Sequence, residues 1–262
     1  MELGQLCQSV IGVARAAADF IRSQSKHFDR LQVEEKSRNN LVSYVDRQAE
    51  RLIVDQLSQL LPHAGFIAEE GSGRQGQGLN WVIDPLDGTT NFVHGVPPYA
   101  VSIGLVEDNQ VLLGVVEEIF SGEVFHAVKG KGAWLGEQPL RVSKEQDLSK
   151  GLIATGFAYD TSDIDHILAV LKRLLVQTHG FRRLGSAAVD LAYVAAGRFE
   201  AFYEKNLNPW DVAAGALLVQ EAGGVVSDFA NGNNFLFGRQ IVASCNEVLH
   251  CRLLETICKL QS

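Results

Sequence analysis

Hydrophobic residues recur every three or four positions over residues 3–24, and this spacing predicts an amphipathic helix. A second helix is predicted to begin after Ser43, because Ser43 and Asp46 have the spacing of a capping box in which aspartate replaces glutamate. Its apolar face recurs up to Pro62, which is expected to end the helix. Residues 27–40, between the two helices, are polar and are interpreted as a mobile loop.

Short apolar runs then replace the helical spacing and indicate strands. Residues 65–69 and 81–84 form two such runs, each of which ends in a carboxylate, and a glycine-rich turn separates them. Three longer runs with turn residues between them predict an antiparallel meander, over residues 100–107, 110–119 and 123–128.

After a polar stretch at residues 143–150 the pattern alternates between strands and helices. Strands are expected at 152–155, near 181, and at 199–204, 224–227 and 240–244, and helices at 164–176, 186–196, 209–222 and 246–260. The alternation predicts a layered α/β (α+β) architecture. We expect a single domain over residues 1–262, with an N-terminal lobe of about 1–148 and a C-terminal lobe of about 149–262 that share one site.

Composition narrows the class of protein. The chain is 46% hydrophobic and 21% charged, and its 262 residues can bury a core without disulfides. The net charge of -8 argues against a nucleic-acid interface, which needs clustered lysine and arginine. The four cysteines form no CxxC pair and are interpreted as free thiols in a reducing compartment. No apolar run approaches the roughly 18 residues of a membrane span, so we expect a cytoplasmic protein without membrane contact.

The clearest chemical feature is the pair Asp84 and Asp87, three positions apart. Pro85 disfavours helical backbone at Asp84, so a sharp turn is predicted directly after the strand. On such a turn the two carboxylates and the Leu86 carbonyl can converge, and oxygen ligands suit Mg²⁺. Gly88 follows and allows successive N–H groups to form an anion site. An ordinary turn capped by Asp84 is the alternative interpretation.

Further acids lie at the ends of regular elements. Glu69 and Glu70 end the preceding predicted strand, and Asp211 lies in the first turn of the helix predicted at 209–222. Each has an ordinary explanation, as a solvated acid or as a charge that the helix dipole favours. Together with Asp84 and Asp87 they favour a metal centre, whose carboxylates would repel one another without cations. Metal affinity is therefore expected to fall at acid pH.

Two long segments resemble the signatures of the inositol monophosphatase family: residues 81–92, Trp-Val-Ile-Asp-Pro-Leu-Asp-Gly-Thr-Thr-Asn-Phe, and residues 209–215, Pro-Trp-Asp-Val-Ala-Ala-Gly. The resemblance runs through nearly the whole chain. It implies a layered αβαβα sandwich, hydrolysis of phosphate monoesters with two or three Mg²⁺ ions, and inhibition by Li⁺. It also implies a homodimer.

The resemblance implies a role for individual residues. The metal ligands would be Glu69, Asp84, the Leu86 carbonyl, Asp87 and Asp211, and Glu69 would also be catalytic. Phosphate would be bound by Gly88 and Thr89, and the attacking water would be oriented by Thr89 and Asp46. The substrate would be contacted by Asp87, Ala187 and Glu204, and a third ion would lie near Lys36 in the mobile loop. The adjacent Arg182 and Arg183 are interpreted as a solvated or interface pair.

The sequence therefore predicts Mg²⁺-dependent hydrolysis of a small phosphate monoester by a metal-activated water. Glu204, seven residues before Asp211, favours a polyol, and myo-inositol monophosphate is the preferred substrate. Fructose-1,6-bisphosphatase, histidinol-phosphate phosphatase and 3′-phosphoadenosine 5′-phosphate phosphatase are the alternatives within this class. A regulatory protein-binding role with a vestigial site is the alternative of another class, and the presence of all four acidic ligands argues against it.

Overall fold

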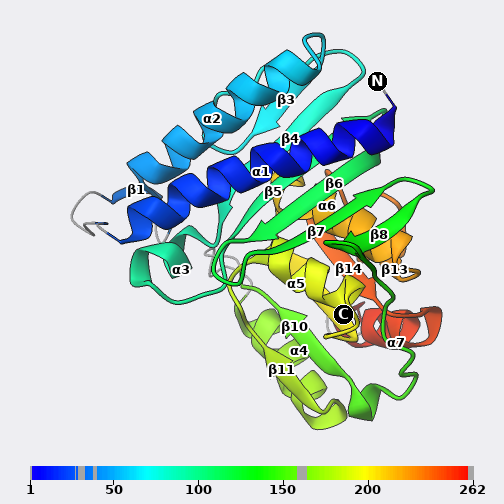
Figure 1. Ribbon diagram of the computed structural model, residues 1–262. Coiled ribbons are helices and arrows are strands. Elements are labelled where there is room, and N and C mark those ends of the chain that lie inside the picture. The colour runs from blue at the N-terminus through cyan, green and yellow to red at the C-terminus, as the bar shows by residue number, and fades with distance from the viewer. Residues whose placement is uncertain (1, 27, 29–32, 38–39, 158–163, 259–262) are drawn as a thin grey trace.

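Five alternating layers of helices and strands make up the structure, a computed structural model that describes residues 2–26, 28, 33–37, 40–157 and 164–258 (Figure 1). Its helices are α1 (Leu3–Ser25), α2 (Tyr44–Leu60), α3 (Thr89–His94), α4 (Ile164–Gln177), α5 (Ala187–Ala195), α6 (Pro209–Glu221) and α7 (Glu247–Cys258). Helices α1 and α2 cover one face of a seven-stranded sheet, and α5 and α6 lie between that sheet and a five-stranded sheet. Helices α4 and α7 cover the far face of the five-stranded sheet. The predicted αβαβα sandwich is confirmed.

The seven-stranded sheet is built from one continuous part of the chain. Its order follows the sequence: β3 (Gly65–Ala68), β4 (Asn80–Asp87), β5 (Ala100–Glu107), β6 (Gln110–Glu118), β7 (Glu123–Val128), β8 (Gly132–Leu135) and β9 (Gln138–Pro139). Only β3 and β4 pair in parallel. The predicted meander corresponds to β5, β6 and β7. The short strands β8 and β9 continue it and were not predicted, because glycines interrupt their apolar pattern.

The five-stranded sheet follows in the C-terminal half, in the order β11-β10-β12-β14-β13. Its strands are β10 (Leu152–Thr155), β11 (Gly180–Arg182), β12 (Ala201–Lys205), β13 (Val225–Ser227) and β14 (Gln240–Ser244). β10 pairs in parallel with β11 and β12, and β14 pairs antiparallel with β12 and β13. The predicted helices of this half end within two residues of α4–α7, and residues 259–260 lie outside the described part.

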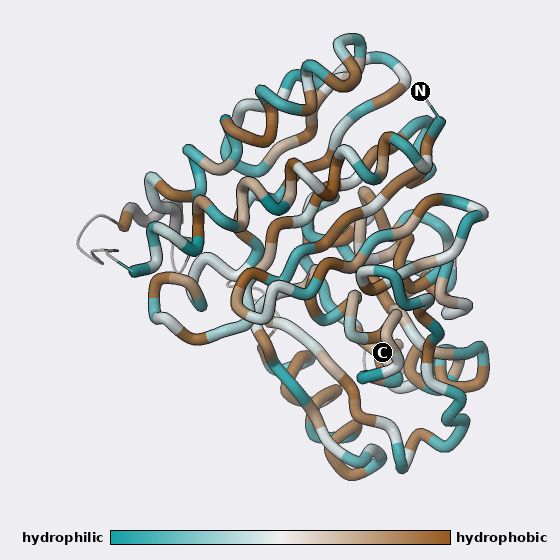
Figure 2. Tube along the Cα trace, in the orientation of Figure 1, coloured by the Kyte–Doolittle hydropathy of each residue, from teal (hydrophilic) through white to brown (hydrophobic). Residues whose placement is uncertain are grey.

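Hydrophobic burial explains the layers. One cluster of buried side chains joins α1 and α2 to the first sheet, a second surrounds α5 and α6, and a third joins the second sheet to α4 and α7. Figure 2 shows polar and apolar residues alternating along α1 and α2, as expected for helices with one buried face. No helix in the described part of the chain combines the length and apolar character needed to cross a membrane.

Helix α6 lies at the centre of the molecule and is apolar on all sides between Val212 and Val219. Glycines on the first sheet allow it to approach closely: a Cβ at Gly114 would lie 2.8 Å from backbone atoms of Ala214, and one at Gly104 would lie 3.1 Å from the Ala213 Cβ. This close contact fixes the first half of α6, whose N-terminal turn carries Asp211, against β5 and β6 of the sheet that also carries Asp84 and Asp87.

The prediction of a loop over residues 27–40 is wrong at residues 34–37 and 40, where the structure has strands. Residues Glu34–Ser37 form β1, which pairs antiparallel with β2 (Asn40–Val42) directly before α2. The polar sequence of β1 gives no apolar alternation, and its pairing partner rather than its own pattern makes it a strand. Residues 27, 29–32 and 38–39 of this segment, and the side chain of Lys36, lie outside the described part.

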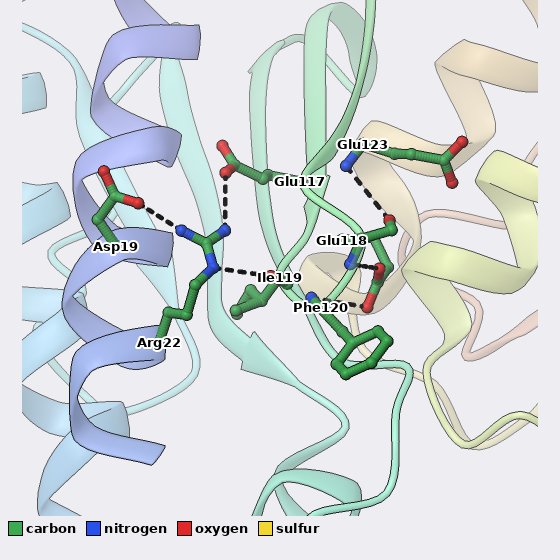
Figure 3. Close-up of polar contacts among 8 residues, drawn as sticks. Asp19, Arg22, Glu117, Glu118, Ile119, Phe120 and Glu123 are labelled. Carbon is green, nitrogen blue, oxygen red and sulfur yellow. Dashed lines mark hydrogen bonds and ion pairs between the residues drawn. The ribbon is translucent and has the colours of Figure 1, made fainter. Parts of the chain in front are cut away.

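A cluster of polar side chains joins α1 to the end of β6 (Figure 3). The Arg22 guanidinium donates to the Ile119 carbonyl at 3.1 Å, pairs with Asp19 on its own helix, and lies 3.8 Å from the Glu117 carboxylate. Burial raises the pKa of Glu117 to about 7, against the lowering effect of Arg22. These contacts fix α1 against the sheet on the side away from α6.

Candidate metal centre and active site

Acidic side chains from both sheets and the central helices meet in one cavity of about 400 Å³. Asp84, Asp87 and Asp211 each offer a carboxylate oxygen, and these oxygens lie within 4.8 Å of one another. Glu69, directly after β3, lines the same cavity but is not part of this close cluster. Of the remaining predicted site residues, those that also line the cavity are Thr89, Ala187 and Glu204.

A bulge in β4 places the two aspartates of the first signature on one side of the sheet. In a regular strand, residues three apart point to opposite faces. In β4, Asp84 pairs with Ser102 and Asp87 with Ala100, so three residues of β4 span the length of two on β5. The extra residue turns both carboxylates to the same side. The predicted turn after Asp84 is wrong, because the strand continues to Asp87 through the bulge and Pro85, which has no N–H, fits there.

Hydrogen bonds fix each carboxylate of the cluster. Asp84 accepts from the Leu86 N–H at 2.9 Å. Asp87 Oδ2 accepts from the Ser186 hydroxyl at 2.6 Å and from the Ala188 N–H at 2.7 Å, which joins it to the N-terminus of α5. Asp211 Oδ2 accepts from the Asn208 N–H at 2.6 Å, at the start of α6.

The cluster is electrostatically strained without a cation. Burial raises the pKa of Asp84 and of Asp211 well above the usual range, and the neighbouring carboxylates raise both further. Burial also raises the pKa of Asp87 to about 6, although the hydrogen bonds from Ser186 and Ala188 oppose the shift. Closely spaced ligands that offer only oxygen are the donor set of a divalent cation such as Mg²⁺. The residues therefore fit the metal that the resemblance implies.

A hydroxyl–carboxylate pair adjoins the cluster. The Thr89 hydroxyl lies 2.9 Å from Asp46 Oδ1 and 3.1 Å from the Leu86 carbonyl oxygen. Asp46 Oδ2 accepts from the N–H and the hydroxyl of Ser43, at 2.8 and 2.6 Å, in the predicted capping box of α2. Gly88 has φ of +93° and a Cβ there would lie 3.2 Å from three neighbouring atoms, so the turn into α3 requires glycine.

A buried glutamate on α2, which the sequence analysis missed, holds the segment after β3. Glu50 accepts from the Glu70 N–H at 2.7 Å and from the Ser72 N–H at 2.8 Å. It is fully buried. These two hydrogen bonds fix the backbone directly after Glu69. The α-helical pattern of residues 44–60 gives no sign of them, since the partners lie 20 and 22 positions away.

We expect Glu50→Gln to weaken Mg²⁺ binding about tenfold, as is typical when a group that supports a metal ligand is changed. The glutamine amide would direct an NH₂ group at one of the two backbone N–H groups, and the Glu69 segment would shift. The Mg²⁺ concentration that gives half-maximal binding in calorimetry measures the effect. Asp55→Asn, which removes the same charge from an exposed position of α2, is the control. Equal Mg²⁺ affinity in Glu50→Gln and wild type would show that Glu50 does not position Glu69.

The second sheet also contributes residues to the cavity. Glu204 reaches it from β12, and its carboxyl group lies against Gly156, where a Cβ would be 2.0–2.1 Å from the carboxyl atoms. Burial raises the pKa of Glu204 to about 8, and Arg183 opposes this shift. Ala187, the first residue of α5, also lines the cavity.

Arg183 and Asp190 also line the cavity, and neither was assigned to the site from the sequence. Arg183 is exposed, as predicted, yet its guanidinium stands 5.9 Å from the centre of the Phe157 ring and lowers the pKa of Asp87 and Glu204. A Cβ at Gly185 would lie 2.7 Å from Arg183, so glycine leaves room for the guanidinium. The position of Arg183 at the cavity follows from the fold and could not be predicted from the sequence.

Comparison with known proteins agrees with the fold. A model of the inositol monophosphatase family matches residues 3–262, and the chain belongs to that family. It is 45% identical over 251 residues to a protein of Pseudomonas aeruginosa named Nus factor SuhB, an alignment that covers 93% of this chain and 92% of the relative.

Two solved structures extend the comparison to three dimensions. The extragenic suppressor protein suhB of Bartonella henselae has a TM-score of 0.93 and 37% identity, and the match covers 97% of this chain and 99% of that one. The inositol monophosphatase of Anabaena has a TM-score of 0.88 and 32% identity, with 99% and 97% covered.

Proposed function

We propose that the chain hydrolyses small phosphate monoesters with Mg²⁺, and that myo-inositol monophosphate is its substrate. The observation that carries the proposal is the convergence of Asp84, Asp87 and Asp211 within one cavity, next to the pair Thr89 and Asp46. Family membership supports phosphatase chemistry. The intact acidic cluster supports a working site rather than a vestigial one.

Two or three Mg²⁺ ions would be held by Glu69, Asp84, the Leu86 carbonyl, Asp87 and Asp211. When bound, they supply Lewis-acid chemistry for an attacking water and for the oxygen that leaves with the alcohol. The chain contributes fixed ligands: hydrogen bonds from Ser186 and Ala188 hold one oxygen of Asp87, so its other oxygen remains for the cavity.

Thr89 and Asp46 orient the water. The Thr89 hydroxyl has one proton, and donating it to Asp46 Oδ1 leaves its lone pairs as acceptors for a water in the cavity. Asp46 stays in place because Ser43 holds its other oxygen. The water thus presents its oxygen to a phosphate that the N–H groups of Gly88 and Thr89 would bind, a role that rests on the family resemblance.

Glu204 and Ala187 would contact the alcohol part of the substrate. Because Glu204 is half-buried and accepts hydrogen bonds when ionised, it suits a polyol hydroxyl. Fructose 1,6-bisphosphate, histidinol phosphate and 3′-phosphoadenosine 5′-phosphate remain the alternative substrates. The predicted homodimer, the third-ion role of Lys36 and the cytoplasmic location also remain predictions.

Phosphate release from a panel of these phosphates, with Mg²⁺ and with EDTA, tests the proposal. We expect the highest kcat/KM for myo-inositol 1-phosphate, no release with EDTA, and inhibition by Li⁺ at millimolar concentration. Release that persists in EDTA would contradict metal dependence. A preference for another member of the panel would replace the substrate and keep the reaction class.

A second role is favoured by the relatives named Nus factor SuhB, which are 40–45% identical to this chain. We infer that the chain also acts as a Nus factor, beside its phosphatase activity. Complementation of a strain that lacks its own SuhB separates the two roles. Rescue by wild type and equally by an inactive Asp87→Asn variant would support a role that needs no catalysis, and failure of both would exclude it.

A further inference from the structure

Asp190 is a buried acid in the cavity for which the proposed mechanism has no use. It lies on α5, four residues after the Ser186 N-cap, and is 1% exposed. Its Oδ1 has no hydrogen-bond partner among the described residues. The helix does not need this carboxyl as a cap, because the Ser186 hydroxyl already accepts from the Val189 N–H.

The surroundings of Asp190 point to a ligand. It lines the same cavity as Glu204, Arg183 and Asp87. A buried carboxyl oxygen without a partner destabilises a fold, so its retention is explained if a bound molecule supplies the missing donor. Besides burial, Glu204 and then Asp87 raise the pKa of Asp190, while Arg183 lowers it. These three cavity-lining residues, the acids Asp190 and Glu204 and the guanidinium of Arg183, are referred to below as the wall.

We propose that Asp190 is a further substrate-recognition residue, which accepts a hydrogen bond from a hydroxyl of the alcohol part of the substrate, next to the hydroxyl that Glu204 binds. This inference rests on the proposed function and deepens it. A hydroxyl donates one proton and accepts with its lone pairs, so neighbouring hydroxyls can donate to Asp190 and Glu204 and accept from Arg183. The wall therefore fits a neutral polyol with adjacent hydroxyl groups.

The same wall disfavours other leaving groups. Burial raises the pKa of both Asp190 and Glu204, so this part of the cavity disfavours negative charge, and a second phosphate would meet two acids and a single guanidinium there. An aryl alcohol without further hydroxyls would leave the carboxyl oxygens of Asp190 and Glu204 without donors. A site built to bind a substrate hydroxyl discriminates strongly against an analogue that lacks it. Discrimination between substrates is therefore the property that Asp190 controls.

The test compares kcat/KM for myo-inositol 1-phosphate and for p-nitrophenyl phosphate, whose leaving group has no additional hydroxyl. We expect Asp190→Ala to lower kcat/KM for the inositol phosphate about 50-fold, mainly through KM, since a hydrogen bond to a charged group is lost. The value for p-nitrophenyl phosphate should change less than about threefold. Asp190→Asn keeps an acceptor oxygen and should recover most of the loss.

Val189→Ala is the matched control. Val189 neighbours Asp190 on α5 and is buried in the core outside the cavity, so its truncation lowers the melting temperature without changing the ratio of the two substrates. If Asp190→Ala lowers both kcat/KM values equally, or neither, Asp190 does not recognise the alcohol and the inference is overturned. A wild-type protein that releases phosphate from neither substrate would instead overturn the proposed function, and this inference with it.

Discussion

Asp87→Asn is expected to abolish Mg²⁺-dependent phosphate release while the fold remains intact. Asparagine has the shape of aspartate, and its carbonyl oxygen can accept the same hydrogen bonds from Ser186 and Ala188. Its NH₂ group then faces the cavity where a ligand oxygen is required. We expect kcat/KM to fall at least about 1,000-fold, because the lost metal contact supplies several kcal/mol of transition-state stabilisation.

The same substitution should stabilise the protein when no metal is present. Burial and crowding raise the pKa values of the cluster, so removal of one charge relieves repulsion between the others. Phosphate release and thermal unfolding in EDTA measure the two effects on one sample. Asp165→Asn, an exposed change on α4, is the control and should alter neither. Turnover like that of wild type in Asp87→Asn would refute the assignment of the metal site.

Thr89→Ala is expected to lower kcat about 100-fold or more, within the range for loss of a side chain that takes part in proton transfer in the transition state. Alanine removes the hydroxyl that links Asp46 to the cavity, and Asp46 is then buried without its Thr89 donor. The acidic cluster itself is unchanged. We therefore expect the Mg²⁺ affinity to stay within a few-fold of wild type.

Thr89→Ser is the matched variant, because it keeps the hydroxyl and loses only a methyl group. It should retain most of the wild-type kcat. Steady-state kinetics over a range of Mg²⁺ concentrations separates the two parameters. If Thr89→Ala lost Mg²⁺ affinity and kcat in parallel, the hydroxyl would act through the metal ligands, and its role in orienting water would be wrong.

Local sequence rules predicted much of the fold. The apolar spacing of residues 3–24 gave α1, and the Ser43–Asp46 box gave the start of α2, because both signals act within a few residues. The path of β4 could not be predicted in this way. Pro85 indicates an interruption, but whether the chain turns or bulges there depends on pairing with β5, whose partner residues lie more than ten positions away.

The same difference between local and long-range signals separates the site residues that the sequence predicts from those that it does not. The acids at strand ends and at the start of α6 are visible in the sequence, and the structure brings Asp84, Asp87 and Asp211 together. Glu50 and Asp190 are not visible, because each lies within a helix and acquires its meaning only from neighbours on other elements. A buried charge in an apolar helix face is the one sign that the sequence could have offered.

Anomalous diffraction from crystals soaked in Mn²⁺ tests the central claim most directly. Mn²⁺ accepts the same oxygen ligands as Mg²⁺ and scatters strongly enough to be located. We predict Mn²⁺ at the cluster, bound by carboxylate oxygens of Asp84, Asp87 and Asp211, with Glu69 completing the ligand set. Crystals in which Mn²⁺ binds elsewhere, and no anomalous peak lies among these carboxylates, would contradict the account.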